Sequence, residues 1–163
     1  MSRLLVALLG CASLWCQDLA PGTTADRILV EKKARKLTLL GAGKPLKSYR
    51  VALGPAPVGD KQCQGDNRTP EGVYTITGRN PRSQFHRSLR ISYPDAAHRA
   101  RARQLGCSPG GDIMIHGLGR SFRHLGRLHT LVDWTAGCIA VTDAEIEEIW
   151  RAVPNGTVVE IRP

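Results

Sequence analysis

The sequence predicts a single domain that is mainly β. Its 163 residues match the size of one domain. Short runs of β-favouring residues recur between segments rich in glycine and proline, whereas only one segment has a clear helical repeat. A hydrophobic content of 42% excludes a disordered chain. No apolar stretch reaches the ~20 residues that a membrane span needs. We therefore expect one globular domain with a β core.

The amino-terminal segment predicts a secretory signal over residues 1–20. Arg3 precedes the apolar run Leu4–Leu9, which is the order found in such signals. The residues leading to Cys11 also resemble a lipoprotein signal, so a lipid anchor at Cys11 is an open alternative. A buried amino-terminal helix is disfavoured, because Pro21–Thr24 separates this segment from the rest of the chain. We expect an exported protein of the periplasm or cell envelope.

Seven runs of apolar and β-branched residues predict the strands. They span residues 28–30, 36–40, 48–53, 72–77, 89–93, 112–116 and 157–161. Gly41–Lys44 has the composition of a hairpin turn, and Gly54–Glu71, with three prolines, predicts a long loop. In the run 112–116, the period of two residues places Ile113 and Ile115 on one face and His116 on the other.

One helix is clearly predicted, over Thr142–Val153. Thr142 and Glu145 have the spacing of a capping box, which favours a helix start at this point. Apolar residues then recur at the positions of one helix face, namely Ile146, Ile149, Trp150 and Val153. The Ala- and Arg-rich segment 95–105 predicts a second, short helix.

The positive charge indicates an anionic partner. The chain has a formal net charge of +9 and a pI near 9.8. Seven arginines lie between residues 79 and 103 against one acidic residue, Asp95. They would recognise carboxylates, or they form a solvated basic face. With only three Trp, three Tyr and two Phe, and no nucleic-acid-binding motif, we predict no nucleic-acid partner.

Cys138 and His116 form a candidate nucleophile and base. Cys138 precedes the predicted helix, and His116 ends a predicted strand 22 residues earlier. A thiol is mostly protonated at neutral pH, so an imidazole that takes its proton would activate it. The amides of Gly137 and Cys138 would serve as oxyanion donors. From these features alone, a buried structural cysteine beside a hydrogen-bonded histidine is equally compatible with the sequence.

Three separated motifs add a family resemblance. They are Thr69-Pro70-Glu71-Gly72-Val73-Tyr74, Ile113-Met114-Ile115-His116-Gly117, and the segment DWTAGCIAVTDAEIEEIW, which contains Cys138. In this order they resemble the YkuD-type L,D-transpeptidases of peptidoglycan, the YafK-like branch in particular. The resemblance covers residues 25–163 and implies a YkuD-like β-sandwich catalytic domain with one firm helix after the catalytic cysteine.

The resemblance implies an acyl transfer with Cys138 as nucleophile and His116 as the proton acceptor. A peptidoglycan stem peptide would form a thioester on Cys138 and then pass to an amine acceptor. Alternatives left open are a cysteine hydrolase of the same fold, which trims stem peptides or releases wall-attached protein, and a basic polyanion-binding envelope module. Oxyanion or substrate contacts are expected from Gly137, Thr135, His129 and Gly117, although His129 is also compatible with a hydrogen-bonded loop residue.

Two departures from the family pattern concern the acceptor. Many members have a histidine where this chain has Ala136, and an arginine where it has Ala140. The identity of the acceptor is therefore not predicted. The histidines and Cys138 match no compact zinc motif, so we predict neither a metal nor a cofactor.

The remaining cysteines divide between the signal and the loops. Cys11 and Cys16 lie in the predicted signal. Cys63 and Cys107 lie in loops outside the matched motifs, and we predict a disulfide between them, with two independent thiols as the alternative.

Overall fold

The computed structural model describes residues 18–163. Most of the predicted export signal, with the candidate lipid-anchor Cys11 and with Cys16, lies outside the described residues. Among the helices of residues 18–163, none has the length and apolar character needed to cross a membrane.

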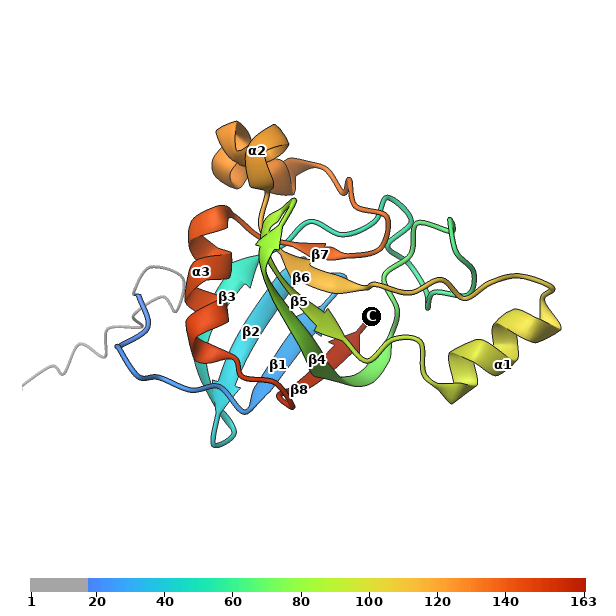
Figure 1. Ribbon diagram of the computed structural model, residues 1–163, viewed down its shortest axis with the longest axis horizontal. Coiled ribbons are helices and arrows are strands. Elements are labelled where there is room, and N and C mark those ends of the chain that lie inside the picture. The colour runs from blue at the N-terminus through green and yellow to red at the C-terminus, as the bar shows by residue number, and fades with distance from the viewer. Residues whose placement is uncertain (1–17) are drawn as a thin grey trace, which may run out of the picture.

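Eight strands and three α-helices are described (Figure 1). The strands are β1 (Arg27–Glu31), β2 (Lys36–Gly41), β3 (Lys44–Arg50), β4 (Gly72–Ser83), β5 (His86–Ile91), β6 (Met114–His116), β7 (Ile139–Ala140) and β8 (Val158–Arg162). The helices are α1 (Ala96–Gln104), α2 (Gly119–Phe122) and α3 (Asp143–Ala152), with a 3-10 segment, η1 (Arg123–Leu131), directly after α2.

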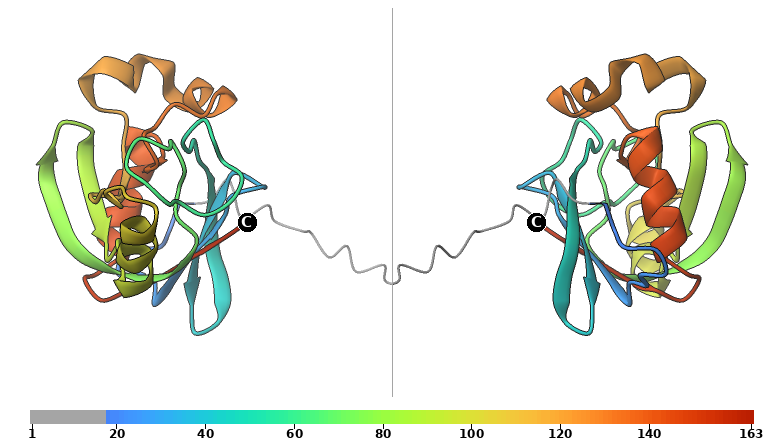
Figure 2. Two further views of the ribbon diagram at one scale, coloured as in Figure 1. Left: turned by 90° about the vertical axis from the view of Figure 1, so that its right-hand side faces the viewer. Right: turned by 90° about the vertical axis from the view of Figure 1, so that its left-hand side faces the viewer.

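The strands form one sheet that bends until its two ends meet. Their order is β3-β2-β1-β8-β4-β5-β6-β7. The pairs β1–β8 and β6–β7 are parallel, and the other neighbours are antiparallel. Ala52, just after β3, bridges to Ala140 in β7 and so joins the ends of the sheet. Figure 2 shows α3 between the layer of β1–β3 and the layer of β4–β5. The prediction of a mainly β domain is confirmed.

The core forms where buried positions alternate along paired strands. Ile28 and Val30 of β1 are fully buried, and their register partners on both sides are also apolar and buried. These partners are Leu39 and Leu37 in β2, and Val159 and Ile161 in β8. Cross-strand pairs of branched side chains stabilise a sheet by their packing as well as by burial.

Helix α3 matches its prediction within one residue at each end. Thr142 accepts a hydrogen bond from the backbone of Glu145, and the Glu145 side chain accepts one from the backbone of Thr142, so the capping box is formed. Ile146 and Ile149 of this helix are fully buried. Trp150 is partly buried, and the guanidinium groups of Arg79 and Arg87 from the β4–β5 hairpin cover part of its ring.

Other boundaries differ from the prediction. β4 continues to Ser83 and β5 begins at His86, so these strands form a long hairpin. The tip of this hairpin is polar and mostly exposed, so no apolar alternation predicted it. β3 begins at Lys44, because exposed Lys44 and Pro45 and the buried polar Lys47 break the apolar alternation. Helix α1 confirms the short helix expected near residues 95–105. No element was predicted for α2 and η1, where Gly126, with φ of 49°, interrupts any regular repeat.

Candidate active site

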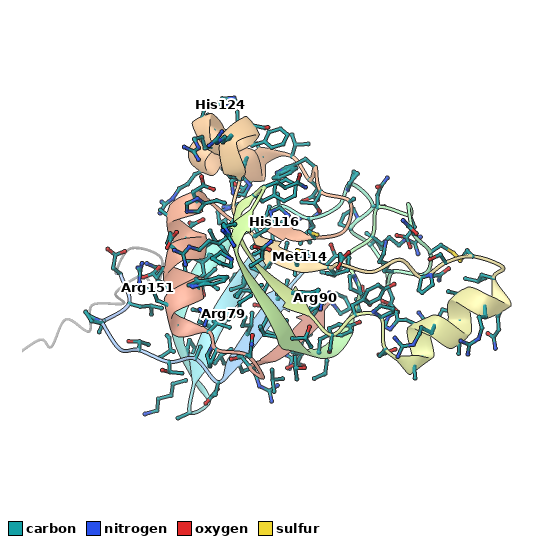
Figure 3. All side chains as sticks on the ribbon, viewed as in Figure 1. Arg79, Arg90, Met114, His116, His124 and Arg151 are labelled. Carbon is teal, nitrogen blue, oxygen red and sulfur yellow. A yellow bond between two sulfur atoms is a disulfide. The ribbon has the colours of Figure 1, made fainter. Side chains whose placement is uncertain are left out.

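The parallel pairing of β6 with β7 brings His116 and Cys138 to one face of the sheet. Ile115 pairs with Ile139 and His116 with Ala140, so Cys138 lies opposite Met114. A hydrogen bond from the Met114 backbone reaches the sulfur, and Sγ in turn donates to the carbonyl of Asp112 at 3.5 Å. Because side chains two residues apart share a face, His116 projects to the same side as Cys138. Figure 3 labels Met114 and His116 on this strand.

His116 is held in one tautomer. Its Nδ1 lies 2.6 Å from the carbonyl oxygen of Gly117, which can only accept, so Nδ1 carries the proton and Nε2 keeps its lone pair. Phe85 stacks on the imidazole with ring centres 4.3 Å apart, and Trp134 approaches edge-on at 6.0 Å. The ring is only 2% exposed. Burial lowers the pKa of His116 to about 4, so the imidazole is neutral at neutral pH.

Cys138 is half-buried and is the free cysteine of residues 18–163. Burial raises its pKa above the ordinary thiol value, although the hydrogen bond from the Met114 backbone partly opposes this. The resting site therefore consists of a neutral thiol and a neutral imidazole.

Thr135 fixes the loop that carries Cys138. Its buried hydroxyl donates to the Cys138 carbonyl at 2.7 Å and accepts from the Gly137 backbone at 3.1 Å. Its own N–H donates to the carbonyl of Leu53 at 2.9 Å, which ties the loop to the strand-end region after β3. The Gly137 amide, predicted as an oxyanion donor, is thus bonded to the threonine in this structure.

Gly137 occupies a position that only glycine fits. Its φ of +121° lies in a region that L-residues rarely adopt. A Cβ at this position would lie 2.6 Å from the carbonyl oxygen of Arg68 in the long loop. The close approach of these two segments brings the loop from residue 54 to residue 71 against the cysteine.

Gly117 packs against the amino-terminal end of α3. A Cβ on Gly117 would lie 2.6 Å from Oδ1 of Asp143 and 2.9 Å from both Ile146 Cγ2 and the Phe85 carbonyl. Oδ1 of Asp143 accepts from the backbone N–H groups of Leu118, at 2.7 Å, and Gly119, at 3.0 Å. Helix α3 therefore holds the turn directly after His116.

The sequence reasoning missed Asp143 and Phe85. Asp143 is the first residue of a capped helix, where an acidic side chain is common and signals nothing beyond the helix start. Phe85 lies in the hairpin tip that the prediction did not recognise as a hairpin.

His129 lines a separate cavity. It projects from η1, is 3% exposed, and forms part of the wall of a cavity of about 600 Å³ between α3, β3 and η1. Neither Cys138 nor His116 lines this cavity. Burial lowers the pKa of His129, and the two histidines are close enough that a charge on His129 would lower the pKa of His116. Thus Cys138, His116, Thr135, Gly137 and Gly117 come together, and His129 lies near His116 but lines the neighbouring cavity.

The predicted disulfide between Cys63 and Cys107 is confirmed. It connects the long loop before β4 with the segment after α1. Gln64 also donates to the carbonyl of Ser108 at 2.7 Å, so the two segments run together toward Asp112 and the thiol. As for metals, no group of three or more His, Cys, Asp or Glu residues in the described range could hold an ion.

Known proteins resemble this chain in sequence and in fold. The family model described as the L,D-transpeptidase catalytic domain, YkuD, matches residues 25–161. The chain therefore belongs to the YkuD L,D-transpeptidase family, and the resemblance seen in the sequence is confirmed. A curated relative is the protein YafK of Escherichia coli strain K12, at 30% identity over 115 residues. The match covers 69% of this chain and 39% of YafK, so the chain spans well under half of that relative.

Solved structures share the fold. The helical cell shape determining protein Pgp2 of Campylobacter jejuni aligns with a TM-score of 0.65 at 22% identity, covering 91% of this chain and 52% of Pgp2. Bd1075 of Bdellovibrio bacteriovorus gives 0.57 at 20% identity, covering 90% of this chain and 53% of Bd1075. L,D-transpeptidase 1 of Mycobacterium tuberculosis gives 0.51 at 13% identity, with 84% and 60% covered. The predicted YkuD-like fold class is confirmed.

Proposed function

We propose that this protein is a cysteine L,D-transpeptidase that forms a thioester with a peptidoglycan stem peptide and transfers the acyl group to an amine. The observation that carries the proposal is the position of His116 and Cys138 on one face of neighbouring strands, with the Nε2 lone pair of His116 unprotonated. A buried structural cysteine would not need an imidazole held in this tautomer by the carbonyl of Gly117.

Acylation begins with two neutral groups. Sγ of Cys138 attacks the stem-peptide carbonyl while Nε2 of His116 takes the thiol proton. The tetrahedral intermediate collapses, the carbon–nitrogen bond breaks, and the imidazolium returns the proton to the leaving amine of the terminal amino acid. The Gly117 carbonyl keeps Nδ1–H oriented in both steps and favours the transient positive charge.

The oxyanion is stabilised by backbone amides of the 135–138 loop. The Cys138 amide is the first candidate. The Gly137 amide joins it only when its bond to the Thr135 hydroxyl is given up. Thr135 thus positions the loop that carries Cys138. Gly117 contributes through its backbone carbonyl, which orients the His116 ring.

Transfer to an amine completes the cycle. The amine attacks the thioester carbonyl, a new amide forms, and Sγ of Cys138 regains the proton that His116 takes from the amine. Water in place of the amine would make the protein a hydrolase. Ala136 and Ala140 stand where many family members have a histidine and an arginine, so the side chains that select the acceptor differ here.

We further propose that the protein works in the cell envelope. The basic residues match an anionic wall polymer whose stem peptides carry carboxylates. The amino-terminal segment is proposed as an export signal, with Cys11 as the lipid-anchor alternative. Leu19 packs against the core, and its N–H donates to Glu148 at 2.5 Å.

The test is incubation of the exported protein with disaccharide-tetrapeptide, followed by mass spectrometry of products and protein. Cross-linked dimers and a thioester adduct on Cys138 are expected. Shortened monomers without dimers would assign hydrolysis instead. Unchanged turnover by Cys138→Ala would overturn the mechanism. The intact mass of the exported protein reports the cleavage site and any lipid.

A further inference from the structure

Lys61 is a buried lysine in the long loop that packs against the cysteine. Its side chain is only 3% exposed, and a lysine is almost never buried to this extent unless its charge is paired. Nζ donates to Oδ1 of Asp66 at 2.7 Å and to the carbonyl of Cys63 at 3.2 Å. Figure 1 shows this loop, between β3 and β4, beside the segment that leads from α1 to β6. None of the steps of the proposed acyl transfer uses this charge.

The loop that holds the buried lysine contacts both segments that flank the thiol. On one side, a Cβ on Gly137 would lie 2.6 Å from the carbonyl oxygen of Arg68. On the other side, the backbone of Gln64 donates to the carbonyl of Ser108 at 2.7 Å. The segment after Ser108 leads to Asp112, whose carbonyl accepts a hydrogen bond from the thiol. The ion pair of the loop therefore lies in the part of the chain that packs around the sulfur.

Asp66, the partner of Lys61, is held by the backbone of the same loop. Its two oxygens accept from the N–H groups of Gln62 at 2.7 Å, Cys63 at 3.1 Å and Arg68 at 3.0 Å, in addition to Nζ of Lys61. Burial raises the pKa of Asp66, but these hydrogen bonds outweigh burial and hold it below its usual range. The carboxylate is therefore charged at neutral pH and fixes the position of the ammonium.

The two charges of this pair act on different groups. Burial raises the pKa of Cys138, and the charge on Lys61 opposes that increase. The charge on Asp66 instead adds to burial in raising the pKa of Tyr93. The pair is therefore oriented, with its positive member on the side of Cys138 and its negative member on the side of Tyr93. A lysine that only neutralised Asp66 would not need this orientation.

The other charged groups near the thiol do not replace Lys61. Asp112 raises the pKa of the thiol, but its side chain is 72% exposed and Arg90 lies 3.5 Å from it, so solvent screens its charge. The ammonium of Lys61 is buried and is screened much less. His116 is neutral at neutral pH, and the charge that acts on it is that of His129. Lys61 therefore favours a negative sulfur without opposing a positive imidazole.

We propose that Lys61 is a positioning residue that acts through Cys138: its ion pair with Asp66 holds a buried ammonium beside the sulfur, where it stabilises the negative charge formed during attack. The inference rests on the proposed function for its role in turnover. As Sγ gives up its proton to Nε2 of His116, the sulfur becomes negative, and a nearby cation in surroundings of low dielectric lowers the energy of that state. The same effect on the thiol exists without any substrate.

The test measures the reactivity of the thiol in the full chain. Iodoacetamide alkylates the thiolate with loss of iodide, and mass spectrometry of the peptide that contains Cys138 follows the rate as a function of pH. Lys61→Met removes the charge and keeps a long side chain. We expect the pKa of Cys138 read from this profile to rise, and the rate near pH 8 to fall about 5-fold or more. Lys61→Arg keeps the charge and should recover most of the loss. An unchanged profile in Lys61→Met would overturn the proposal.

Asp66→Asn breaks the same ion pair from its other side. Asparagine retains an acceptor oxygen for the loop backbone but removes the negative charge, so the charge on Lys61 is no longer balanced. We expect Cys138 to be alkylated at least as fast as in the wild type. Slower alkylation in both Asp66→Asn and Lys61→Met would overturn the proposal, because the loss would then follow from the broken pair and not from the sign of the charge.

Lys32 provides a matched control in the same part of the fold. It is 1% exposed and donates to the carbonyl of Thr69 at 2.9 Å and to the carboxylate of Glu71 at 2.8 Å, at the end of the loop. Lys32→Met also removes a buried charge and an ion pair, but it should leave the pH profile of Cys138 alkylation unchanged. A change as large as that of Lys61→Met would overturn the proposal. Absence of turnover by the wild type would overturn only the proposed function, because alkylation needs no substrate.

Discussion

At the scale of single residues, the Thr135 hydroxyl holds the cysteine loop in shape. It bonds to the Cys138 carbonyl and to the Gly137 amide from a buried position. Thr135→Val keeps the volume but removes both bonds. We expect kcat for D-amino-acid release to fall about 10-fold, equivalent to ~1.4 kcal/mol. Thr135→Ser, which keeps the hydroxyl, should stay within about 2-fold of the wild type. Equal rates for the valine and serine variants would show that the hydroxyl does not position the cysteine.

The pKa of His116 sets the acid side of the pH profile. The base must be neutral to accept the thiol proton, and burial lowers its pKa from 6.5 to about 4. In the proposed mechanism, protonation of His116 therefore stops turnover only as the pH falls toward 4. The acid limb of kcat/KM, which reports the free enzyme, should lie near pH 4. Initial rates measured across this range check it. An acid limb near 6.5 would mean that the imidazole is solvated in the working enzyme.

At the scale of elements, the start of α3 supports the turn after His116. Asp143 accepts two backbone N–H groups, from Leu118 and Gly119. Asp143→Ala leaves both donors unpaired and should cost about 1–3 kcal/mol in the free energy of unfolding. Turnover should also fall, because the turn carries the Gly117 carbonyl that orients His116. Asp143→Asn retains an acceptor oxygen and should recover most of both losses. Chemical denaturation and the turnover assay measure the two effects. If Asp143→Ala unfolds like the wild type, helix α3 does not support this turn.

The elements also show why part of the site was predictable. Helix α3 carries its own signals, a capping box and an apolar face, so its limits follow from local sequence. The strand ending at His116 follows from alternation over a few residues. The α2–η1 segment has no such repeat, since Gly126 changes the chain direction within it. The prediction for His129 rested on its distance from Cys138 in sequence, which says nothing about which side of η1 it faces.

At the scale of the whole molecule, long-range pairing brings the site together. The order of the strands depends on contacts such as the bridge of Ala52 with Ala140, which are far apart in sequence and have no local signature. The mainly β class was predictable from composition and alternation, whereas the meeting of the sheet ends was not. The disulfide is the exception, because Cys63 and Cys107 both lie in predicted loops outside the matched motifs, which is enough to propose a bond between them.

That disulfide should matter to stability and to the site. It joins residues 44 apart in sequence, so it restricts the unfolded chain by about 4 kcal/mol. Reduction, or the double change Cys63→Ser and Cys107→Ser, should lower the melting temperature by about 10 °C. The segment after Cys107 leads to Asp112, whose carbonyl contacts Sγ of Cys138, so kcat/KM should fall as well. Calorimetry with and without reductant measures the first effect, and reductant should leave the double variant unchanged. A wild-type melting temperature that does not move after complete reduction, verified by mass, would show that the loops hold together without the bond.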